Sequence, residues 1–474
     1  MFAGASLGLL LLWCGGGMSW RPLRHVPIKM MVAGAGDGGV VVIGGGFGGL
    51  YTALKLERRL RDRASPCTVT LIDPKDRFVF LPLLYELAVG SASALEVAPR
   101  YRDLLRETKI RFVQGTVQNV DLASRSVSVL PCTNASGGSI SAEKAEEMTI
   151  AFDKVVLACG AQPNLSVIPG APQHALPFCT IDHANRLSAR LRALVESNRA
   201  EIRVAVLGGG YSGVEVSSTV AEYLGARGRV TILDRNECVM VSSPAHNRRE
   251  AERVLGAKGV DVLCRASVQE VTAEGVVYSI PSPAATAATA AAATATAAAT
   301  SVLLPSDLVI ATLGVAQSPV VQALPLEKDR FGRVLTSRSL RAKSDPNLFA
   351  LGDCSCVEGE SVPSTAQAAM QQSDIVVANV MLSLAEPAAV AEASLRKFSF
   401  VPLGEMLTLG TKDAAVTSLA GLVELDGLVA SVGRRLVYAL RMPTPQQSLT
   451  ALVSSSVVMA ANELNRLLGP NGKP

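Results

Sequence analysis

Two glycine-rich loops in this sequence have the residue types and the spacing that bind a diphosphate. The stretch VVVIGGGFGGLYTAL begins at residue 40, and the chain nearly repeats it as VAVLGGGYSGVEVSSTV from residue 204. Each copy fits G-x-G-x-x-G, whose glycines allow a tight turn, close approach of a pyrophosphate and packing of helix on strand. The pyrophosphate would lie at the positive end of the following helix. The predicted cofactor-binding residues are Gly44, Gly46, Phe47 and Gly49 in the first loop, and Gly208, Gly210, Tyr211 and Gly213 in the second.

Each loop is followed by a second β-like run that ends in an acidic residue. These runs are TVTLIDPKD, which contains Asp73, and RVTILDRNE, which contains Asp234. A carboxylate at this position can accept hydrogen bonds from ribose hydroxyls. Two complete βαβ units therefore predict two dinucleotide sites, one for a cofactor that stays bound and one for a nucleotide that visits.

The elements that position these loops indicate an α/β fold with two Rossmann-like dinucleotide-binding domains, the second inserted in the first, and a C-terminal tail. Strands ending at Gly160 and Gly314 return the chain to corresponding places in the two domains. A further piece, NLFALGDCSCV, places Asp353 at the carboxyl end of a strand, where open α/β sheets bind ligands. The expected ranges are 39–178 and 331–395 for the first domain, 179–330 for the second domain and 396–474 for a C-terminal region.

Composition excludes several other classes of protein. The 474 residues carry a formal net charge of +4, which is too mild to imply a nucleic acid partner. Nine cysteines lack regular spacing and only four histidines are present, so we expect neither a disulfide framework nor a metal site. Residues 1–38 fit an organellar targeting leader, with a later true start codon as the alternative. The alanine- and threonine-rich stretch 283–301 is interpreted as a surface-loop insertion.

Several further motifs resemble those of the two-dinucleotide-domain flavoproteins, and within them the type II NAD(P)H:quinone oxidoreductases. These motifs are RFVFLPLLYELAVG at 77–90, STAQAAMQQ at 364–372 and LGEMLTLGTKDAAV at 403–416. The resemblance covers about residues 40–470 and is closest to the plant and algal C1-type enzymes, the plastid demethylphylloquinone reductases. It implies FAD held noncovalently by the first domain, NADH or NADPH bound by the second, and a membrane quinone as acceptor.

The resemblance also assigns three candidate catalytic residues. Glu215 matches a glutamate near the nicotinamide and quinone, where it could relay protons. An early-turn acid stabilised by the helix dipole is the alternative, and the motif match favours the first interpretation. The pattern A-Q-x-A-x-Q is present as Ala366, Gln367, Ala369 and Gln371. Ala366 is expected at the cofactor. The two glutamines are one helical turn apart and could bind quinone oxygens or satisfy buried backbone, and the resemblance favours the quinone.

Related proteins of the same architecture offer alternative functions. Disulfide reductases need a cysteine pair beside the flavin, and no cysteine occurs between Cys67 and Cys132. Sulfide:quinone oxidoreductase is harder to exclude because Cys159 and Cys179 are present, although the A-Q-x-A-x-Q pattern argues against it. A flavin-binding scaffold of the apoptosis-inducing-factor type is the least consistent with intact motifs at both nucleotide sites.

A lipid-soluble quinone requires that the enzyme reach a membrane. The segment GLVASVGRRLVYALRM places Leu428, Val432, Leu436 and Leu440 on one helical stripe, with its arginines elsewhere around the helix. This segment and a later apolar one are too short or interrupted to span a bilayer. We expect a monotopic, interface-lying helix pair, with an ordinary core-packing pair as the alternative.

Location and nucleotide preference complete these expectations. The resemblance implies a chloroplast enzyme, peripheral on the thylakoid membrane or plastid lipid particles, with the mitochondrion as the alternative. A homodimer is possible. Asp234 favours the free 2′-hydroxyl of NADH, whereas the adjacent Arg235 can bind the 2′-phosphate of NADPH. We expect NADH to be preferred and NADPH tolerated.

Overall fold

The first dinucleotide unit is built around a parallel sheet with β1 (Gly39–Ile43) at its centre. The computed structural model describes residues 38–132, 146–280, 301–385 and 391–454. β1 pairs with β2 (Val69–Asp73) and β5 (Met148–Leu157), β2 pairs with β3 (Arg111–Asp121), and β5 pairs with β17 (Leu348–Ala350). Every residue of β1 is buried, and its β-branched run suits a parallel sheet that is covered on both faces.

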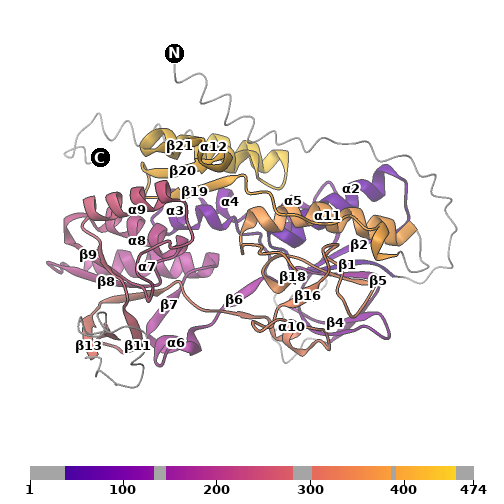
Figure 1. The fold of residues 1–474 in the computed structure, drawn as a ribbon, viewed down its shortest axis with the longest axis horizontal. Coiled ribbons are helices and arrows are strands. Elements are labelled where there is room, and N and C mark those ends of the chain that lie inside the picture. The colour runs from indigo at the N-terminus through magenta and orange to yellow at the C-terminus, as the bar shows by residue number, and fades with distance from the viewer. Residues whose placement is uncertain (1–37, 133–145, 281–300, 386–390, 455–474) are drawn as a thin grey trace, which may run out of the picture.

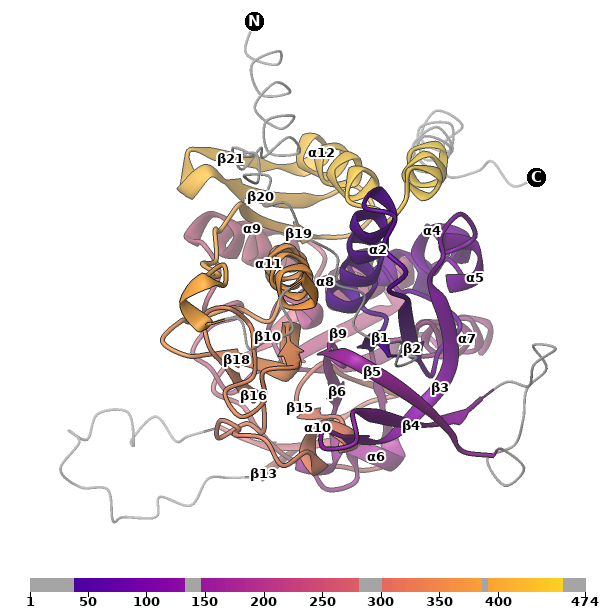
Figure 2. The same cartoon turned by 90° about the vertical axis from the view of Figure 1, so that its right-hand side faces the viewer.

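Helices and an antiparallel extension surround this sheet. α2 (Phe47–Asp62) follows β1 and packs against α11 (Ala366–Ala385), as Figures 1 and 2 show. β4 (Ser126–Pro131) pairs in antiparallel fashion with the outer parts of β3 and β5. The short helices after β2 are α3 (Leu84–Ala88), α4 (Ala94–Val97) and α5 (Tyr101–Leu104).

The second unit repeats this plan. Its sheet is parallel throughout, in the order β10 (Asp261–Leu263), β9 (Gly228–Leu233), β8 (Ile202–Leu207), β14 (Leu308–Ala311) and β7 (Ala175–Pro177). Its helices are α6 (Ala171–His174), α7 (Ile181–Glu196), α8 (Tyr211–Leu224) and α9 (Ala245–Ala257), and its antiparallel strands are β11 (Ser267–Val271), β12 (Gly275–Ser279) and β13 (Ser301–Pro305). Because β7 pairs with β14, the second unit begins before the boundary expected at residue 179.

A two-stranded connection links the units. β6 (Ala161–Pro163) pairs with β15 (Val315–Gln317), where the chain leaves the first unit and later returns to it. The returning segment contains α10 (Pro319–Ala323) and β16 (Val334–Thr336). It continues with β17, which joins β5, and with β18 (Ser355–Val357). The second unit is therefore inserted in the first.

A C-terminal layer lies across both units. It consists of the antiparallel strands β19 (Gly404–Thr408), β20 (Ala414–Ser418) and β21 (Val423–Asp426), followed by α12 (Gly427–Leu440) and a helical segment at 445–454. In Figure 1 this yellow layer runs along the top of the molecule, above α3 and α8. Within the described ranges, no helix combines the length and the apolar character needed to cross a bilayer.

Three predicted segments lie largely outside the described residues. These are residues 1–37 of the expected leader, residues 283–300 of the alanine- and threonine-rich stretch, and residues 455–474 of the later apolar C-terminal stretch.

Candidate active site

The first glycine loop has the shape that a bound diphosphate needs. Gly44 has φ +100°, and a Cβ on Gly49 would lie 1.7 Å from the Gly44 carbonyl oxygen. Side chains are therefore excluded at both positions. Gly46 begins α2 with no side-chain cap and with open space where its Cβ would stand. Since the first turn of α2 holds no acid, the helix dipole and the N–H groups of that turn favour an anion.

The second loop repeats this geometry. Gly208 has φ +103°, and a Cβ on Gly213 would lie 1.8 Å from the Gly208 carbonyl oxygen. Gly210 begins α8, again without a side-chain cap and with open space at its Cβ position. Both loops thus fit the diphosphate of a dinucleotide.

Each predicted ribose-binding acid is held by its own glycine loop. Asp73 accepts hydrogen bonds from the Gly45 N–H at 2.7 Å and from the N–H of the second residue after Asp73 itself at 2.8 Å. Asp234 likewise accepts hydrogen bonds from the Gly209 N–H at 2.5 Å and from the N–H of the second residue after Asp234 itself at 2.7 Å. These contacts keep both carboxylates beside the loops where the sequence places the riboses.

Both units open on one cavity of about 1280 Å³. A pocket for one ligand typically measures about 300–1,000 Å³, so this volume suits more than one ligand. The predicted residues that line the cavity are Gly44, Gly46, Phe47, Asp73, Gly160, Tyr211, Glu215, Asp353, Ala366, Gln367 and Gln371. The predicted residues that do not line it are Gly49, Gly208, Gly210, Gly213, Asp234 and Gly314. The structure therefore brings the first loop and all three candidate catalytic residues to one space.

Glu215 is a buried carboxyl group at the wall of this cavity. Its Oε1 accepts a hydrogen bond from the Thr408 backbone N–H at 2.9 Å. Burial raises the pKa of Glu215 to about 7, and the Thr408 N–H and the Tyr85 hydroxyl oppose this rise. Stabilisation by the helix dipole alone would instead lower the pKa. A carboxyl group with this pKa can release and accept a proton near neutral pH.

Gln367 and Gln371 hold the segment that leads into β19. The Gln367 Nε2 donates to the Gly404 carbonyl at 3.2 Å, and its Oε1 accepts from the Leu403 N–H at 3.1 Å. The Gln371 amide pairs in the same way with the Val401 carbonyl at 2.8 Å and the Val401 N–H at 3.1 Å. The backbone contacts that the sequence left open as an alternative are therefore present, and each amide retains one N–H for a ligand.

Aromatic side chains that are absent from the predicted site also line the cavity. The rings of Phe80 and Tyr438 meet edge to face with centroids 5.4 Å apart, and Phe80 meets Phe47 at 5.3 Å. Tyr85 stacks on Phe178 with centroids 5.3 Å apart. Such surfaces suit flat ligand rings. The motif at 77–90 contains Phe80 and Tyr85 and was an available signal, whereas only tertiary packing brings Tyr438 from α12 to the cavity.

The cysteines near the cavity lack the features of a reactive pair. Cys159 and Cys179, on which the sulfide:quinone alternative depends, both line the cavity. Cys159 donates to the Ile43 carbonyl at 3.7 Å, and the Cys179 thiol lies 3.6 Å from His183 Nδ1. Burial raises the pKa of both thiols and so favours their protonated forms, whereas attack on sulfur requires a thiolate.

Two dinucleotide-type loops, of which the first lines the cavity and the second is followed by the cavity residues Tyr211 and Glu215, define a nucleotide-dependent oxidoreductase, and comparisons with known proteins agree. The family model for pyridine nucleotide-disulphide oxidoreductases matches residues 38–373. A demethylphylloquinone reductase from Synechocystis is 35% identical over 87% of this chain and 94% of its own length. The alternative NAD(P)H-ubiquinone oxidoreductase C1 of Arabidopsis thaliana, chloroplastic/mitochondrial, is 33% identical over 90% of this chain and 84% of its own length.

A solved structure shows the same fold. The Plasmodium falciparum NDH2 in complex with NADH has a TM-score of 0.72 and 16% identity, and the match covers 89% of this chain and 98% of that one. This chain belongs to the pyridine nucleotide-disulphide oxidoreductase family, and within that family to the type II NAD(P)H:quinone oxidoreductases.

Proposed function

We propose that this protein is a FAD-dependent, non-proton-pumping NAD(P)H:quinone oxidoreductase that acts on a membrane quinone of the demethylphylloquinone or plastoquinone type. The observation that carries the proposal is the single cavity shared by the first glycine loop, Glu215 and Gln367. Bound FAD would supply the chemistry of accepting a hydride from NADH or NADPH and of two-electron transfer to the quinone. The chain binds and aligns the reactants in a cavity with an aromatic wall.

The residues of the first site would hold the FAD. The N-terminus of α2 would hold the diphosphate, Asp73 the ribose, and Asp353 the ribityl hydroxyls. Asp353 lines the cavity, and burial raises the pKa of its carboxyl group. Glu215 would hold the proton that the quinone takes up.

The proposal is tested with purified protein, which should be yellow and contain about one FAD per chain. Steady-state oxidation of NADH and of NADPH is measured in liposomes with a panel of naphthoquinones and benzoquinones. We expect turnover with both ring classes, and we expect naphthoquinones to be at least as good substrates as benzoquinones. Reduction of the flavin by sulfide, or negligible turnover with every quinone, would favour the two alternative functions instead.

The two glutamines would shape the quinone end of the cavity, both through the segment 401–404 and through their remaining N–H groups. Gln367→Ala should lose quinone reduction while NADH still bleaches the flavin. The matched control is Gln322→Ala, because the Gln322 amide also donates to a backbone carbonyl, that of Gln317, but does not line the cavity. Quinone reduction by Gln367→Ala at the parent rate would show that the proposed quinone site is wrong.

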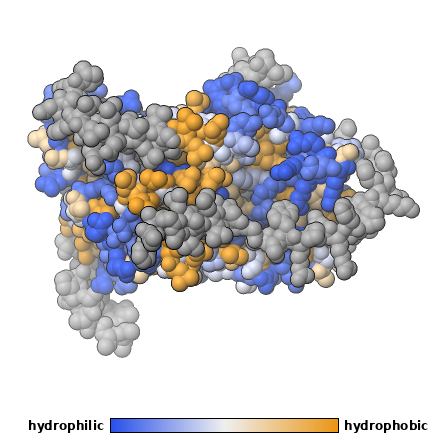
Figure 3. Space-filling view, turned by 90° about the horizontal axis from the view of Figure 1, so that it is seen from above, coloured by the Kyte–Doolittle hydropathy of each residue, from blue (hydrophilic) through white to orange (hydrophobic). Residues whose placement is uncertain are grey.

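Peripheral attachment to a membrane is also part of the proposal. The outward side of α12 exposes Leu428 (64%), Val429 (62%), Val432 and Leu440, and Leu422 beside it is 86% exposed. Figure 3, seen from above the C-terminal layer, shows hydrophobic side chains gathered on this face. An apolar face of this kind favours a helix that lies in the membrane interface.

Binding to liposomes of anionic plant-type lipids tests the attachment. Leu428→Glu together with Val432→Glu should abolish cosedimentation with the vesicles and leave the reduction of soluble short-chain quinones intact. Val315→Glu is the control, because Val315 is 74% exposed on β15, away from this face. Equal loss of binding in the control would point to a nonspecific charge effect.

We also propose a chloroplast location, on thylakoid membranes or plastid lipid particles, with the mitochondrion as the alternative. The chloroplastic/mitochondrial enzyme of Arabidopsis thaliana supports either organelle. Import into isolated chloroplasts and mitochondria, with N-terminal sequencing of the product, distinguishes them. A homodimer is tested by light scattering of the purified protein.

A further inference from the structure

Three charged side chains are buried together between α3 and α12. Glu86 on α3 and Arg434 on α12 are both 0% exposed, and Arg435 is 5% exposed. Glu86 Oε1 accepts a hydrogen bond from Arg434 Nη2 at 2.7 Å, and Glu86 Oε2 accepts one from Arg435 Nη2. One carboxylate therefore pairs with two guanidinium groups. Arg434 also acts on the buried carboxyl group of Glu96 on α4, whose pKa burial raises and Arg434 lowers.

Both arginines have buried donors that these contacts leave unmatched. Nε and Nη1 of Arg434 and Nη1 of Arg435 have no hydrogen-bond partner among the described residues. The Arg434 guanidinium lies over the ring of Tyr438, 5.2 Å from the ring centroid. A buried charge is costly unless its donors are matched, so Arg434 favours the anionic form of a nearby carboxyl group.

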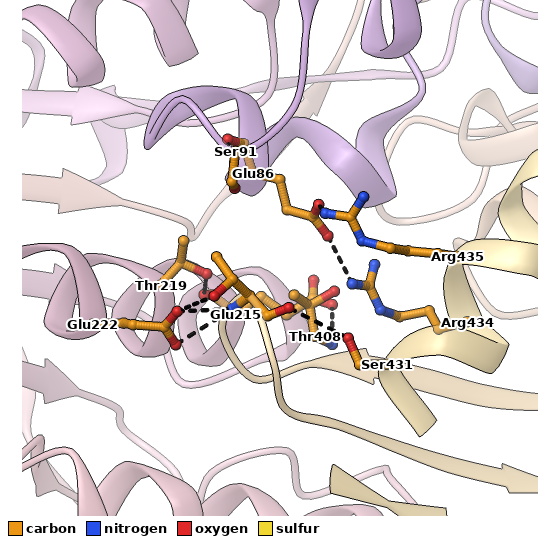
Figure 4. A network of polar contacts seen from close by, with 10 residues as sticks. Glu86, Ser91, Glu215, Thr219, Glu222, Thr408, Ser431, Arg434 and Arg435 are labelled. Atoms are coloured by element: carbon orange, nitrogen blue, oxygen red, sulfur yellow. Dashed lines mark hydrogen bonds and ion pairs between the residues drawn. The ribbon is translucent and has the colours of Figure 1, made fainter. Parts of the chain in front are cut away.

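Glu215 is the carboxyl group at the cavity wall on which Arg434 acts. The elements packed around its carboxyl group contribute the Tyr85 hydroxyl from α3, the Thr408 N–H from β19, and Arg434 and Tyr438 from α12. Of these groups Arg434 alone carries a positive charge, and it favours the ionised form of Glu215. Figure 4 shows the Arg434 guanidinium between the Glu86 carboxylate and the contact of Glu215 with Thr408.

We propose that Arg434 is a positioning residue that supplies the counter-charge to Glu215, and that Glu86 fixes where this charge lies. The inference rests on the proposed function, in which Glu215 gives a proton to the quinone. A hydride brings two electrons and one proton, so formation of the quinol needs one further proton. That proton leaves the Glu215 carboxyl group, which regains it from water, and Arg434 stabilises the carboxylate in between.

Neighbouring residues on α12 provide a matched pair of variants. Arg434→Met and Arg435→Met each remove one guanidinium from the same carboxylate, and Arg434 is the one that lowers the pKa of Glu215. Arg434→Lys keeps the charge. Glu86→Gln has nearly the same shape, but it removes the anion that partly neutralises Arg434, so it changes the charge near Glu215 in the opposite direction.

The test uses rapid mixing of the holoenzyme in two separate steps, flavin bleaching by NADH and reoxidation by quinone, each as a function of pH. In the parent enzyme, the reoxidation rate should fall as pH rises through the pKa of Glu215. Arg434→Met should move this fall to higher pH by about one unit, because an opposite charge nearby lowers a carboxyl pKa by about that amount or more. Arg434→Lys should restore the parent position, Arg435→Met should retain it, and Glu86→Gln should move the fall to lower pH.

The outcomes separate this inference from the proposed function. Glu215→Gln should remove the pH-dependent fall, and its persistence would show that Glu215 is not the proton donor. If Glu215→Gln removes the fall but Arg434→Met and Arg435→Met have the same pH profile, the counter-charge role of Arg434 is overturned. Should Arg434→Met not fold, an unshifted fall in Glu86→Gln overturns it instead.

Discussion

The two glycine loops have nearly the same backbone, but different groups donate a hydrogen bond to the loop carbonyl. Over the first loop, the Tyr101 hydroxyl donates to the Gly45 carbonyl at 2.8 Å. Over the second, the backbone N–H of Met240 donates to the Gly209 carbonyl at 2.8 Å. The same acceptor is thus satisfied by a side chain in one unit and by the main chain in the other.

The two loops also differ in how they meet the cavity. The first loop lines the cavity from Gly44 to Gly48, whereas the glycines of the second do not line it, and that unit contributes the side chains of Tyr211 and Glu215. This difference fits a resident cofactor in the first unit and a nucleotide that comes and goes in the second. A duplicated motif therefore sets the local hydrogen bonds, and the surrounding structure decides what each copy does.

Substituting the last glycine of each loop should break the comparison most strongly. Gly49→Ala and Gly213→Ala each push a Cβ against a backbone carbonyl, which costs about 1–3 kcal/mol, roughly a tenfold to hundredfold loss of affinity. Gly49→Ala should lose FAD, measured by the flavin absorbance of the purified protein. Gly213→Ala should keep FAD and lose its reduction by NADH. Gly256→Ala, an exposed position with open space in α9, is the control that should change neither. Loss of FAD from both loop variants would contradict separate roles.

The two acids should give the next largest effects. Asn in place of Asp73 or Asp234 keeps one acceptor oxygen and loses a charge-assisted hydrogen bond to a backbone N–H, worth about 1.5–3 kcal/mol. Asp73→Asn should weaken FAD binding about tenfold or more, and Asp234→Asn should raise the KM for NADH by a similar factor. Titration of apoprotein with FAD and steady-state kinetics measure the two effects. A normal KM for NADH in Asp234→Asn would argue against the second site.

Tyr101→Phe should have a smaller effect that is confined to the first loop. It removes the hydrogen bond to the Gly45 carbonyl and should lower the free energy of unfolding by about 1 kcal/mol. Urea unfolding of the holoprotein measures this change. Tyr223→Phe, at an exposed position on α8, is the control. An equal loss of unfolding free energy there would show that the effect is not specific to the hydrogen bond with the Gly45 carbonyl.

Arg235→Ala should give the smallest effect and refine the nucleotide preference. Arg235 is exposed beside Asp234, and an exposed ionic contact is worth about 0.2–1 kcal/mol. The KM for NADPH should rise about twofold to fivefold, while the KM for NADH stays unchanged. Arg229→Ala removes another exposed cation of the same sheet, paired with Glu201, and serves as the control. A large preference for NADPH in the parent enzyme would mean that Arg235 outweighs Asp234.

The fold class could be predicted to a large extent, because its signals are local. The strand, glycine loop, helix and acid of each unit follow one another within a short stretch, so Gly44 and Asp73 mark the first site without knowledge of the rest. The boundary before the second unit was harder to predict, since β7 is only three residues long and joins its sheet by pairing with β14, far along the chain.

The candidate site could be predicted only in part. Glu215, Gln367 and Gln371 were identified by motif, and all three line the cavity. Their partners were not identified, because the segment 401–404 and Thr408 approach them only through tertiary folding. No local pattern shows which backbone a side chain will contact when the two are separated by many residues.

The sequence by itself determined that this chain carries two dinucleotide loops in the order of a flavoprotein, because steric limits on glycine and the periodicity of strands and helices act over short distances. It also placed apolar residues on one stripe of α12. Only the tertiary structure decided that this stripe faces outward while Arg434 and Arg435 point inward to Glu86. The reason is physical: burial and charge pairing depend on what lies opposite a helix, and the carboxylate that pairs with these arginines comes from α3, at the other end of the chain.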